Sequence, residues 1–509
     1  MSTELSVASF DYLGEAWTLI DCPGSVELGH EARCAMMVAD AVVVVCEPQP
    51  ERAVAVSSLL RFLDERDIPH LIFVNKMDQP KASVRATLEA LQAYSTRPLL
   101  LREIPMRDEA GQVTGMVDLV SERAWRWQPH QASALVSLPE RLLDEEGQAR
   151  STLLEALADF DDRLMEELLE DVVPSTDDIY QNLTRDLQDD LVVPVFFGSA
   201  ENGNGIHRLL KALRHEVPAS EVTAARRGIS TDQGPTAEVF RTLFAGQTGK
   251  VSLARVWAGE IRDGLTLGRD RIGGVSALMG RKSTSRRSAQ AGEVVALSRM
   301  ASAATGDLLC GERGIEADWP EPPPPLFAVA LSAQRQSDDV KLTSALGRMC
   351  QEDPSLKSEH NPETGELIVS GQGDLHLQIM LSRLQSEYGL TVTRERPTLP
   401  YRETITRPGQ QHARHKKQSG GHGEFADVLI EVRPEPRGSG FRFADRITGA
   451  WCPSSTSRRS RRGSNPTSRA ARSDFRSWTW PCRSWTAAFT RWTAPTWRSR
   501  RPRRRRCPS

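Results

Sequence analysis

Three short polar turns, each directly after an apolar run, constrain the fold of this chain more than any other feature. The turns are Asp21-Cys22-Pro23-Gly24, Asn75-Lys76-Met77-Asp78 and Ser199-Ala200, and the runs before them are residues 17–20, 71–74 and 195–197. Apolar runs bounded by turn residues are typical of buried strands. Ligands bind beyond the carboxyl ends of strands in open α/β sheets. The sequence therefore predicts a parallel sheet with a ligand site at that edge.

The residue types in these turns suit a guanine nucleotide. An aspartate before Pro-Gly, such as Asp21, holds Mg²⁺ through water in phosphoryl-transfer sites, and the glycine leaves its N–H free to approach a γ-phosphate. The carboxylate of Asp78 can accept hydrogen bonds from the N1–H and 2-amino groups of guanine, while Asn75 reaches another edge of the base. Ser199-Ala200 can present a backbone N–H to the guanine oxygen. Each turn alone is weak evidence, but three in this order are strong evidence.

In this order the turns resemble the third, fourth and fifth guanine-nucleotide motifs of translational GTPases, and the sequence is similar to elongation factor G over about residues 1–450. The resemblance implies GTP or GDP and Mg²⁺ as cofactors, with Asp21 on the Mg²⁺ side, Gly24 at the γ-phosphate and Lys76 on the face of the purine. It implies ribosomal translocation coupled to GTP hydrolysis by a cytoplasmic monomer that contacts ribosomal RNA and proteins and no membrane. A ribosome-recycling or ribosome-protection paralogue, or a ribosome-binding module without turnover, stays open.

Two departures from that family bear on hydrolysis. No Gly-x-x-x-x-Gly-Lys-[Ser/Thr] phosphate loop occurs in the 509 residues, and in the family this loop would precede the present Met1. Ser25 stands where the family has a histidine that orients the attacking water, so no catalytic residue is assigned. His30 falls on the following helix and is interpreted as a surface or packing residue. We therefore expect weak nucleotide binding, because the backbone N–H groups that normally cradle the phosphates are missing.

Composition limits the class of protein. A chain of 509 residues is expected to form about three to four domains. Its eight cysteines have no Cys-x-x-Cys spacing, which indicates neither a zinc site nor a disulfide framework. The richest apolar run, Ala35 to Cys46, is too short for a membrane span and is interrupted by Asp40. We expect a soluble protein of the reducing cytosol.

Changes of periodicity predict a multidomain fold that combines α/β, β-barrel and α+β parts. The predicted parts are an incomplete P-loop-type GTPase domain at 1–217 with an inserted subdomain at about 100–190, a β-barrel at 234–314, a ferredoxin-like α+β domain at 325–398, and a partial fourth domain of the elongation factor G type at 401–450.

A basic, glycine-rich segment follows in the predicted fourth domain. It consists of His415, Lys416, Lys417, Gln418, Ser419, Gly420 and Gly421. A solvated loop is the plain interpretation. The resemblance implies a loop at the tip of the domain that contacts ribosomal RNA, where cations meet phosphates.

The composition changes abruptly at residue 451. Residues 451–509 contain 16 arginines and six tryptophans, but no valine, isoleucine, leucine or methionine. A segment without aliphatic residues cannot offset its conformational entropy, so we predict disorder. A one-base shift of the reading frame after Ala450 would recode residues 451–463 as Val-Val-Pro-Lys-Gln-Tyr-Ile-Pro-Ala-Val-Glu-Glu-Gly, a continuation similar to the family's fourth domain. The tail is therefore interpreted as a frameshifted reading.

Overall fold

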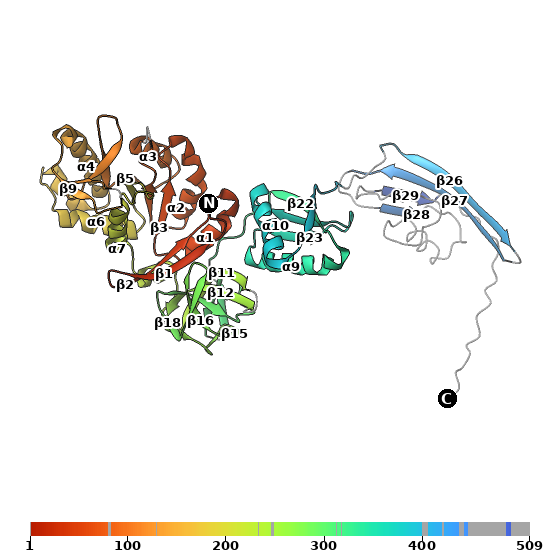
Figure 1. Ribbon diagram of the computed structural model, residues 1–509. Coiled ribbons are helices and arrows are strands. Elements are labelled where there is room, and N and C mark those ends of the chain that lie inside the picture. The colour runs from red at the N-terminus through yellow and green to blue at the C-terminus, as the bar shows by residue number, and fades with distance from the viewer. Residues whose placement is uncertain are drawn as a thin grey trace. The chain divides into compact units, whose positions relative to one another are not determined.

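The computed structural model describes residues 2–79, 83–128, 130–232, 234–245, 249–311, 313–316, 318–399, 406–419, 422–436, 442–445 and 485–489. They belong to two compact units, Met1–Pro397 and Thr398–Ser509, each described here by itself (Figure 1). Within these ranges, no helix is both long and apolar enough to cross a bilayer.

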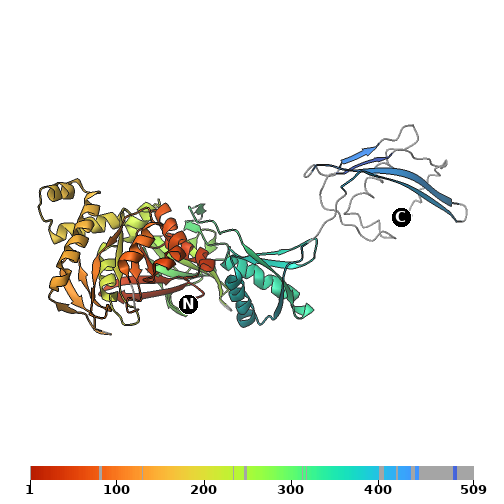
Figure 2. The ribbon, with the colours of Figure 1, turned by 90° about the horizontal axis from the view of Figure 1, so that it is seen from above.

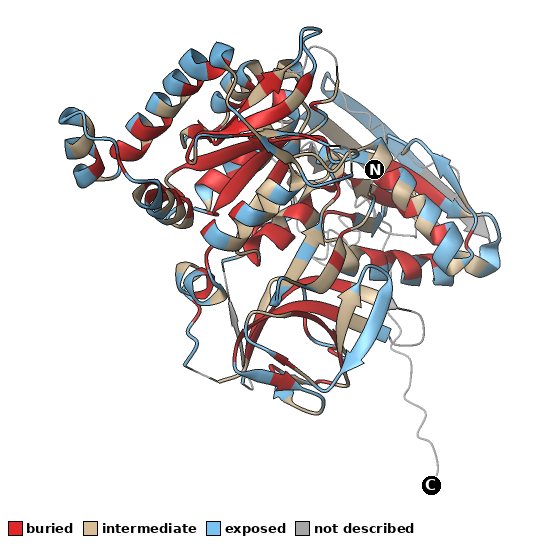
Figure 3. Cartoon of the chain, turned by 60° about the vertical axis from the view of Figure 1, so that its left-hand side comes forward, coloured by how far each residue is buried: buried red, intermediate tan, exposed pale blue. Residues whose placement is uncertain are grey.

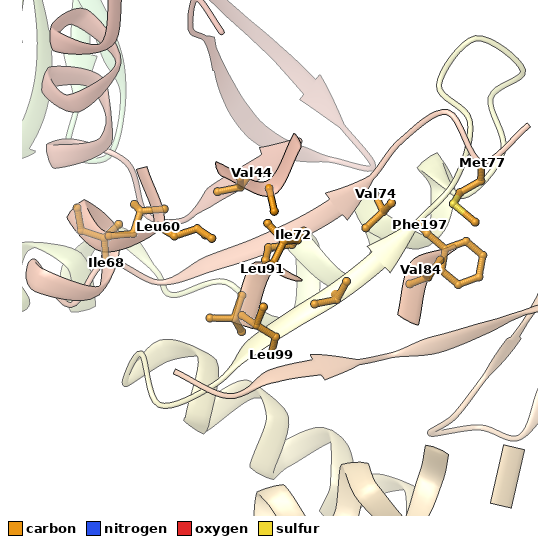
Figure 4. Packing of buried hydrophobic residues seen from close by; sticks show 14 of the residues in the cluster. Val44, Leu60, Ile68, Ile72, Val74, Met77, Val84, Leu91, Leu99 and Phe197 are labelled. Carbon is orange, nitrogen blue, oxygen red and sulfur yellow. The ribbon is translucent and has the colours of Figure 1, made fainter. Parts of the chain in front are cut away.

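A four-stranded parallel sheet forms the centre of the amino-terminal part. Its strands, in spatial order, are β3 (Val42–Cys46), β4 (His70–Val74), β10 (Val193–Phe197) and β5 (Leu99–Leu101). Every residue of β4 and β10 is buried, because alternate side chains pack into hydrophobic clusters on opposite faces. Figure 4 shows Ile72, Val74 and Phe197 in one of these clusters. The apolar runs at residues 71–74 and 195–197 thus predicted β4 and β10 correctly, as expected for strands buried on both faces.

Helices and short 3-10 turns pack against this sheet, and Figure 3 shows their buried inner and exposed outer faces. They are α1 (Gly29–Met37), η2 (Pro50–Val56), α2 (Ser57–Glu65), α3 (Val84–Gln92) and α7 (Ile206–Glu216). Two further elements pack elsewhere: η1 (Val26–Leu28) contacts α10 (Asp374–Tyr388), and α8 (Ser220–Arg226) contacts β12 (Gly249–Ala258).

The strand before Asp21 lies outside the parallel sheet. β1 (Ser6–Tyr12) and β2 (Glu15–Asp21) form an antiparallel hairpin, and β1 pairs with β16 (Val275–Met279) in a nine-stranded sheet. The prediction that Asp21 ends a buried strand is therefore wrong. No residue of β2 is fully buried, and its residues are exposed or half-buried.

A separate subdomain is inserted between β5 and β10. It has its own hydrophobic core, built around Val117, Leu119 and Leu157. Its elements are β6 (Glu103–Arg107), β7 (Val113–Asp118), β8 (Arg123–Arg126), β9 (Ala134–Val136), η3 (Glu140–Leu142), α4 (Leu143–Ala158), α5 (Asp162–Leu169) and α6 (Thr176–Gln188).

Antiparallel strands make up the next part of the chain, around a core that includes Val239, Val256 and Leu297. The pairing runs β2-β1-β16-β19-β12-β11-β20-β21, with β17 beside β16. The remaining bounds are β11 (Thr236–Ala245), β12 (Gly249–Ala258), β13 (Glu260–Arg262), β14 (Thr266–Leu267), β15 (Asp270–Arg271), β17 (Lys282–Arg286), β18 (Ser288–Gln290), β19 (Val294–Ser298), β20 (Asp307–Cys310) and β21 (Arg313–Glu316).

The last domain of this unit has the order βαββαβ, which agrees with the predicted ferredoxin-like α+β class. Its sheet runs β23-β24-β22-β25, and helices α9 and α10 contribute Leu346, Met349, Leu377 and Leu384 to the core. The elements are β22 (Phe327–Ala333), η5 (Gln336–Asp338), α9 (Asp339–Glu352), β23 (Lys357–His360), β24 (Leu367–Gly371), α10 (Asp374–Tyr388) and β25 (Val392–Glu395).

The described part of the second unit is a four-stranded sheet. The long strands β26 (Gly409–Ser419) and β27 (His422–Pro434) form a ribbon (Figure 2), and the sheet continues through β29 (Trp485–Phe489) to β28 (Arg442–Asp445). Residues 415–419 therefore lie in a strand, which corrects the predicted loop; they pair with 422–426. Gly420 and Gly421 lie outside the described residues, as do the side chains of 415–428.

The predicted disorder of residues 451–509 is contradicted at β29. This strand pairs antiparallel with β27 and parallel with β28. Its tryptophan, threonine and phenylalanine are residue types that favour a pleated strand, which outweighs the lack of aliphatic residues here. The rest of the predicted disordered segment lies outside the described residues.

Candidate nucleotide site

Two of the three predicted turns meet at the carboxyl edge of the parallel sheet. β4 and β10 end side by side, with Val74 paired to Phe197. The Met77 N–H donates a hydrogen bond of 2.9 Å to the Gly198 carbonyl, and the Gly198 N–H donates one of 2.9 Å to the Val74 carbonyl. Figure 4 shows Met77 beyond the end of β4, near Phe197. The loops that follow the two strands are therefore held together by the backbone.

Asn75 connects these loops through its side chain. Its Oδ1 accepts hydrogen bonds from the N–H of Lys76 at 2.8 Å and of Ala200 at 2.9 Å. Its own N–H donates to the Cys46 carbonyl at the end of β3, at 2.8 Å. The ends of three neighbouring strands are thus joined at one residue. The Nδ2 group of Asn75 makes no hydrogen bond to the part of the chain that the structure describes, so it is available to a ligand.

The rest of the second turn divides between core and surface. Met77 is fully buried in the core, so its side chain anchors the turn and does not face a ligand. Asp78 is half-buried, and its carboxylate makes no hydrogen bond with any residue described. Lys76 is exposed, with a positive φ of 60° and its Nζ at 2.5 Å from Glu47 Oε1. The hydrogen bond from Lys76 lowers the pKa of the Glu47 carboxyl. Left-handed backbone at a non-glycine residue is strained and is common at functional sites.

The third turn closes on itself. Ser199 and Asn204 exchange two backbone hydrogen bonds, of 3.1 and 2.9 Å. The Nδ2 group of Asn202 donates to the Ser199 hydroxyl at 3.1 Å. Sequence reasoning missed both asparagines, although Asn-Gly-Asn-Gly at 202–205 is a recognisable turn signal. Ala200 is exposed at the tip of this loop.

Asp21-Cys22-Pro23-Gly24 stands apart from the other two turns. Asp21 is exposed at the end of β2 and Pro23 is buried. Burial, assisted by nearby carboxylates, raises the pKa of the Cys22 thiol to about 12, so this cysteine is unreactive. Among the residues the structure describes, no hydrogen bond joins this segment to Asn75 or Ala200.

Ser25 and His30 follow this turn. The Ser25 carbonyl accepts the Leu28 N–H at 3.0 Å and so begins η1, but its hydroxyl caps nothing. His30 is 6% exposed on α1, with Nε2 at 3.8 Å from the Cys34 thiol, and burial lowers its pKa. The interpretation of His30 as a packing residue agrees with this placement.

Three family models match this chain. The elongation factor Tu GTP binding domain matches residues 1–219, elongation factor G domain III matches 322–396, and elongation factor G domain IV matches 397–464.

Relatives cover most of the chain. It is 42% identical over 455 residues to an elongation factor G-like protein of Synechocystis sp., which is 89% of this chain and 68% of the relative. It is 30% identical over 465 residues to an elongation factor G-like protein of Thermotoga maritima, covering 88% and 67%. The chain is also similar to the crystal structure of a Thermus thermophilus protein, with a TM-score of 0.80 and 27% sequence identity. The match covers 96% of this chain and 72% of the Thermus thermophilus chain. The chain therefore belongs to the elongation factor G family of translational GTPases.

Proposed function

We propose that this elongation factor G-like, GTP-binding protein holds the guanine base at the carboxyl edge of its parallel sheet. The observation that carries the proposal is the convergence of two loops on Asn75, whose Oδ1 binds the N–H groups of both Lys76 and Ala200. The match to a GTP binding domain over residues 1–219 supports guanine nucleotide as the ligand.

Each side chain has a distinct part in base recognition. Asp78, with its unoccupied carboxylate, accepts hydrogen bonds from the N1–H and 2-amino groups of guanine. Asn75 Nδ2 donates to another edge of the base. The Ala200 N–H donates to the guanine oxygen, and its hydrogen bond to Asn75 Oδ1 breaks when the base binds. The aliphatic stem of Lys76 covers the purine face, while its ammonium group keeps Glu47. Because adenine has the opposite donor pattern, the site selects guanine.

Asp21 fits the Mg²⁺ side of the site. Its carboxylate is exposed and makes no hydrogen bond within the described ranges, and Mg²⁺ prefers such hard oxygen ligands, often through water. The ion would supply positive charge against the phosphates. Gly24, with open space around its Cα, leaves its N–H accessible to a γ-phosphate.

The family's role supports action on the ribosome, in translocation coupled to GTP hydrolysis, by a cytoplasmic monomer. Recycling and protection paralogues share the same domains and stay alternatives. A ribosome-binding role without turnover is favoured by one specific observation: Ser25 occupies the position of the family's water-orienting histidine, and its hydroxyl lacks the base character of an imidazole.

Titration calorimetry with GDP, run up to millimolar concentration on the whole chain, tests the base site. Asp78→Asn exchanges an acceptor for a donor, so we expect GDP binding to weaken about 10- to 100-fold, the loss of a charge-assisted hydrogen bond of ~1.5–3 kcal/mol. Asp263→Asn, at an exposed hairpin of the barrel, is the matched control and leaves binding unchanged. Equal affinity of the wild-type chain for ADP and GDP would refute the proposal.

A further inference from the structure

β10 loses its strand partner on one side just before the Ser199–Ala200 loop. β5 pairs with β10 only as far as Leu101 and Val195, after which the Arg102 N–H donates to the Val195 carbonyl at 3.1 Å. In a parallel strand the N–H and the carbonyl of one residue face the same neighbour, and every second residue repeats this direction. The N–H of Phe197 therefore points to the same side as the Val195 carbonyl. Among the described residues no strand carbonyl continues on this side, because the chain turns away into the inserted subdomain.

A buried carboxylate takes the place of the missing strand. Glu103 Oε1 accepts the Phe197 N–H at 2.9 Å. Glu103 is fully buried, and it is the first residue of β6 in the inserted subdomain. An unpaired backbone N–H that is buried costs free energy. The Glu103 side chain therefore supplies the acceptor that the last residue of β10, two positions before Ser199, would otherwise lack.

The inserted subdomain contacts the same loop at two more points. The rings of Trp127 and Phe197 meet edge to face, with centroids 5.9 Å apart. The His130 N–H donates to the Asn202 carbonyl at 2.9 Å. The subdomain thus braces both the strand end and the far side of the Ser199–Ala200 loop.

Charged groups from β7, α7 and the residue before it lie near Glu103. Burial raises its pKa to about 7, an effect opposed by the Phe197 N–H and by the arginines and reinforced by Asp118. Its Oε2 finds no hydrogen-bond partner among the residues described. The neighbouring charges are Arg102 beside it, Asp118 on β7, Arg208 on α7, which pairs with Asp118 at 2.6 Å, and Glu216 on α7, which binds Arg102 at 2.6 and 3.1 Å.

We propose that Glu103 is a positioning residue for guanine recognition: its carboxylate fixes the end of β10 and so holds the Ala200 N–H where it meets the base. Binding groups keep a productive position only when a second layer of hydrogen bonds locks them. The inserted subdomain therefore forms the rear wall of the base site. This inference rests on the proposed base site at Asn75, Asp78 and Ala200.

The test compares Glu103→Leu with Glu103→Gln in the whole chain by GDP calorimetry at pH 6 and pH 8. Leucine removes the acceptor, and we expect binding to weaken about two- to tenfold, the ratio that corresponds to one hydrogen bond of ~0.5–1.5 kcal/mol. Glutamine keeps an acceptor oxygen, so we expect Glu103→Gln to bind GDP more tightly than Glu103→Leu. We expect the gain in GDP affinity from pH 6 to pH 8 to be larger for the wild-type chain than for Glu103→Gln, because an ionised carboxylate is the stronger acceptor and the titration of GDP itself is common to both proteins. Glu155→Gln, on the exposed face of α4, is the control.

Hydrogen exchange in the absence of nucleotide reports on the loop itself. We expect Glu103→Leu to speed exchange in residues 197–204 more than elsewhere. GDP binding that is unchanged in Glu103→Leu, or a pH dependence that is equal in the wild-type chain and Glu103→Gln, overturns the positioning role and leaves the base site intact. Absence of GDP binding by the wild-type chain overturns both. If Glu103→Leu fails to fold, the pH profile of Glu103→Gln decides alone.

Discussion

A single amide oxygen joins the two loops of the base site. Asn75 Oδ1 accepts two backbone N–H groups, one from each loop, so Asn75→Ala leaves both without this partner. We expect the free energy of unfolding, measured with urea, to fall by about 1–3 kcal/mol.

Asn75→Asp separates stability from binding at the same position. Aspartate keeps an acceptor for the two N–H groups but loses Nδ2, the group proposed to donate to the base. The unfolding free energy should then stay near that of the wild-type chain while GDP affinity falls. A variant that retains full affinity would show that Nδ2 has no part in recognition.

Glu103 predicts a pH dependence of stability. Its folded pKa of about 7 exceeds the ordinary value of 4.5, because burial disfavours the charge. The folded state therefore binds the proton more tightly than the unfolded state, so this contribution to stability is complete below pH 4.5 and is lost as pH rises through 7. The difference in unfolding free energy between the wild-type chain and Glu103→Gln should change between pH 5 and pH 7.5; a constant difference would contradict it.

At the scale of elements, the junction after β10 depends on a glycine. A Cβ at Gly198 would lie 2.2 Å from the Asn204 carbonyl oxygen and 2.9 Å from the Phe73 ring. Gly198→Ala should therefore force the loop and β4 apart and cost roughly 1–3 kcal/mol of unfolding free energy, as overpacking does. Gly147→Ala is the contrasting control. It lies in open space on α4, where alanine should stabilise by about 0.5–1 kcal/mol. A tolerated Gly198→Ala would mean that the loop adapts.

The elements that could be predicted from the sequence are those with a strong local pattern. The runs at β4 and β10 are apolar throughout, which indicates burial on both faces without knowledge of any partner. The sheet to which β2 belongs could not be predicted, because β2 joins it through its partner β1, which pairs with β16 far along the chain. The strand at β29 was missed because the lack of aliphatic residues over 451–509 outweighed a short run of strand-favouring residues, whose partners are β27 and β28.

The residues of the candidate site also differ in how far the sequence could predict them. Asn75 and Ala200 follow the apolar runs of β4 and β10, so the sequence could predict that their loops lie side by side. Asn202 carried a local turn signal that was overlooked. Glu103 could not be found, because it comes from another subdomain and contacts Phe197 across 94 positions of sequence. Nothing in an isolated glutamate indicates such a contact.

At the scale of the whole first unit, the segment after Asp21–Gly24 contacts the βαββαβ domain. Glu27 Oε2 accepts the His376 N–H at the start of α10, at 2.8 Å. The His376 ring in turn contacts the Asp353 carboxylate, with Nε2 2.8 Å from Oδ2. A carboxylate at a helix N-terminus is favoured by the exposed N–H groups and the helix dipole. This contact links the segment proposed to meet the γ-phosphate to a distant domain of the chain, since Glu27 and His376 are 349 positions apart.

The Glu27 carboxylate occupies space that a side chain at residue 373 would fill, and Gly373 leaves it open. A Cβ at residue 373 would lie 2.3 Å from Glu27 Cδ, so Gly373→Ala displaces the carboxylate from the start of α10. Glu27→Ala removes the same carboxylate, and each change alone should cost about 1–2 kcal/mol of unfolding free energy. The double variant has no carboxylate left to displace, so its loss should be close to that of one single variant. A double-mutant cycle by urea unfolding measures this coupling, and strictly additive losses would show that Gly373 and Glu27 act independently.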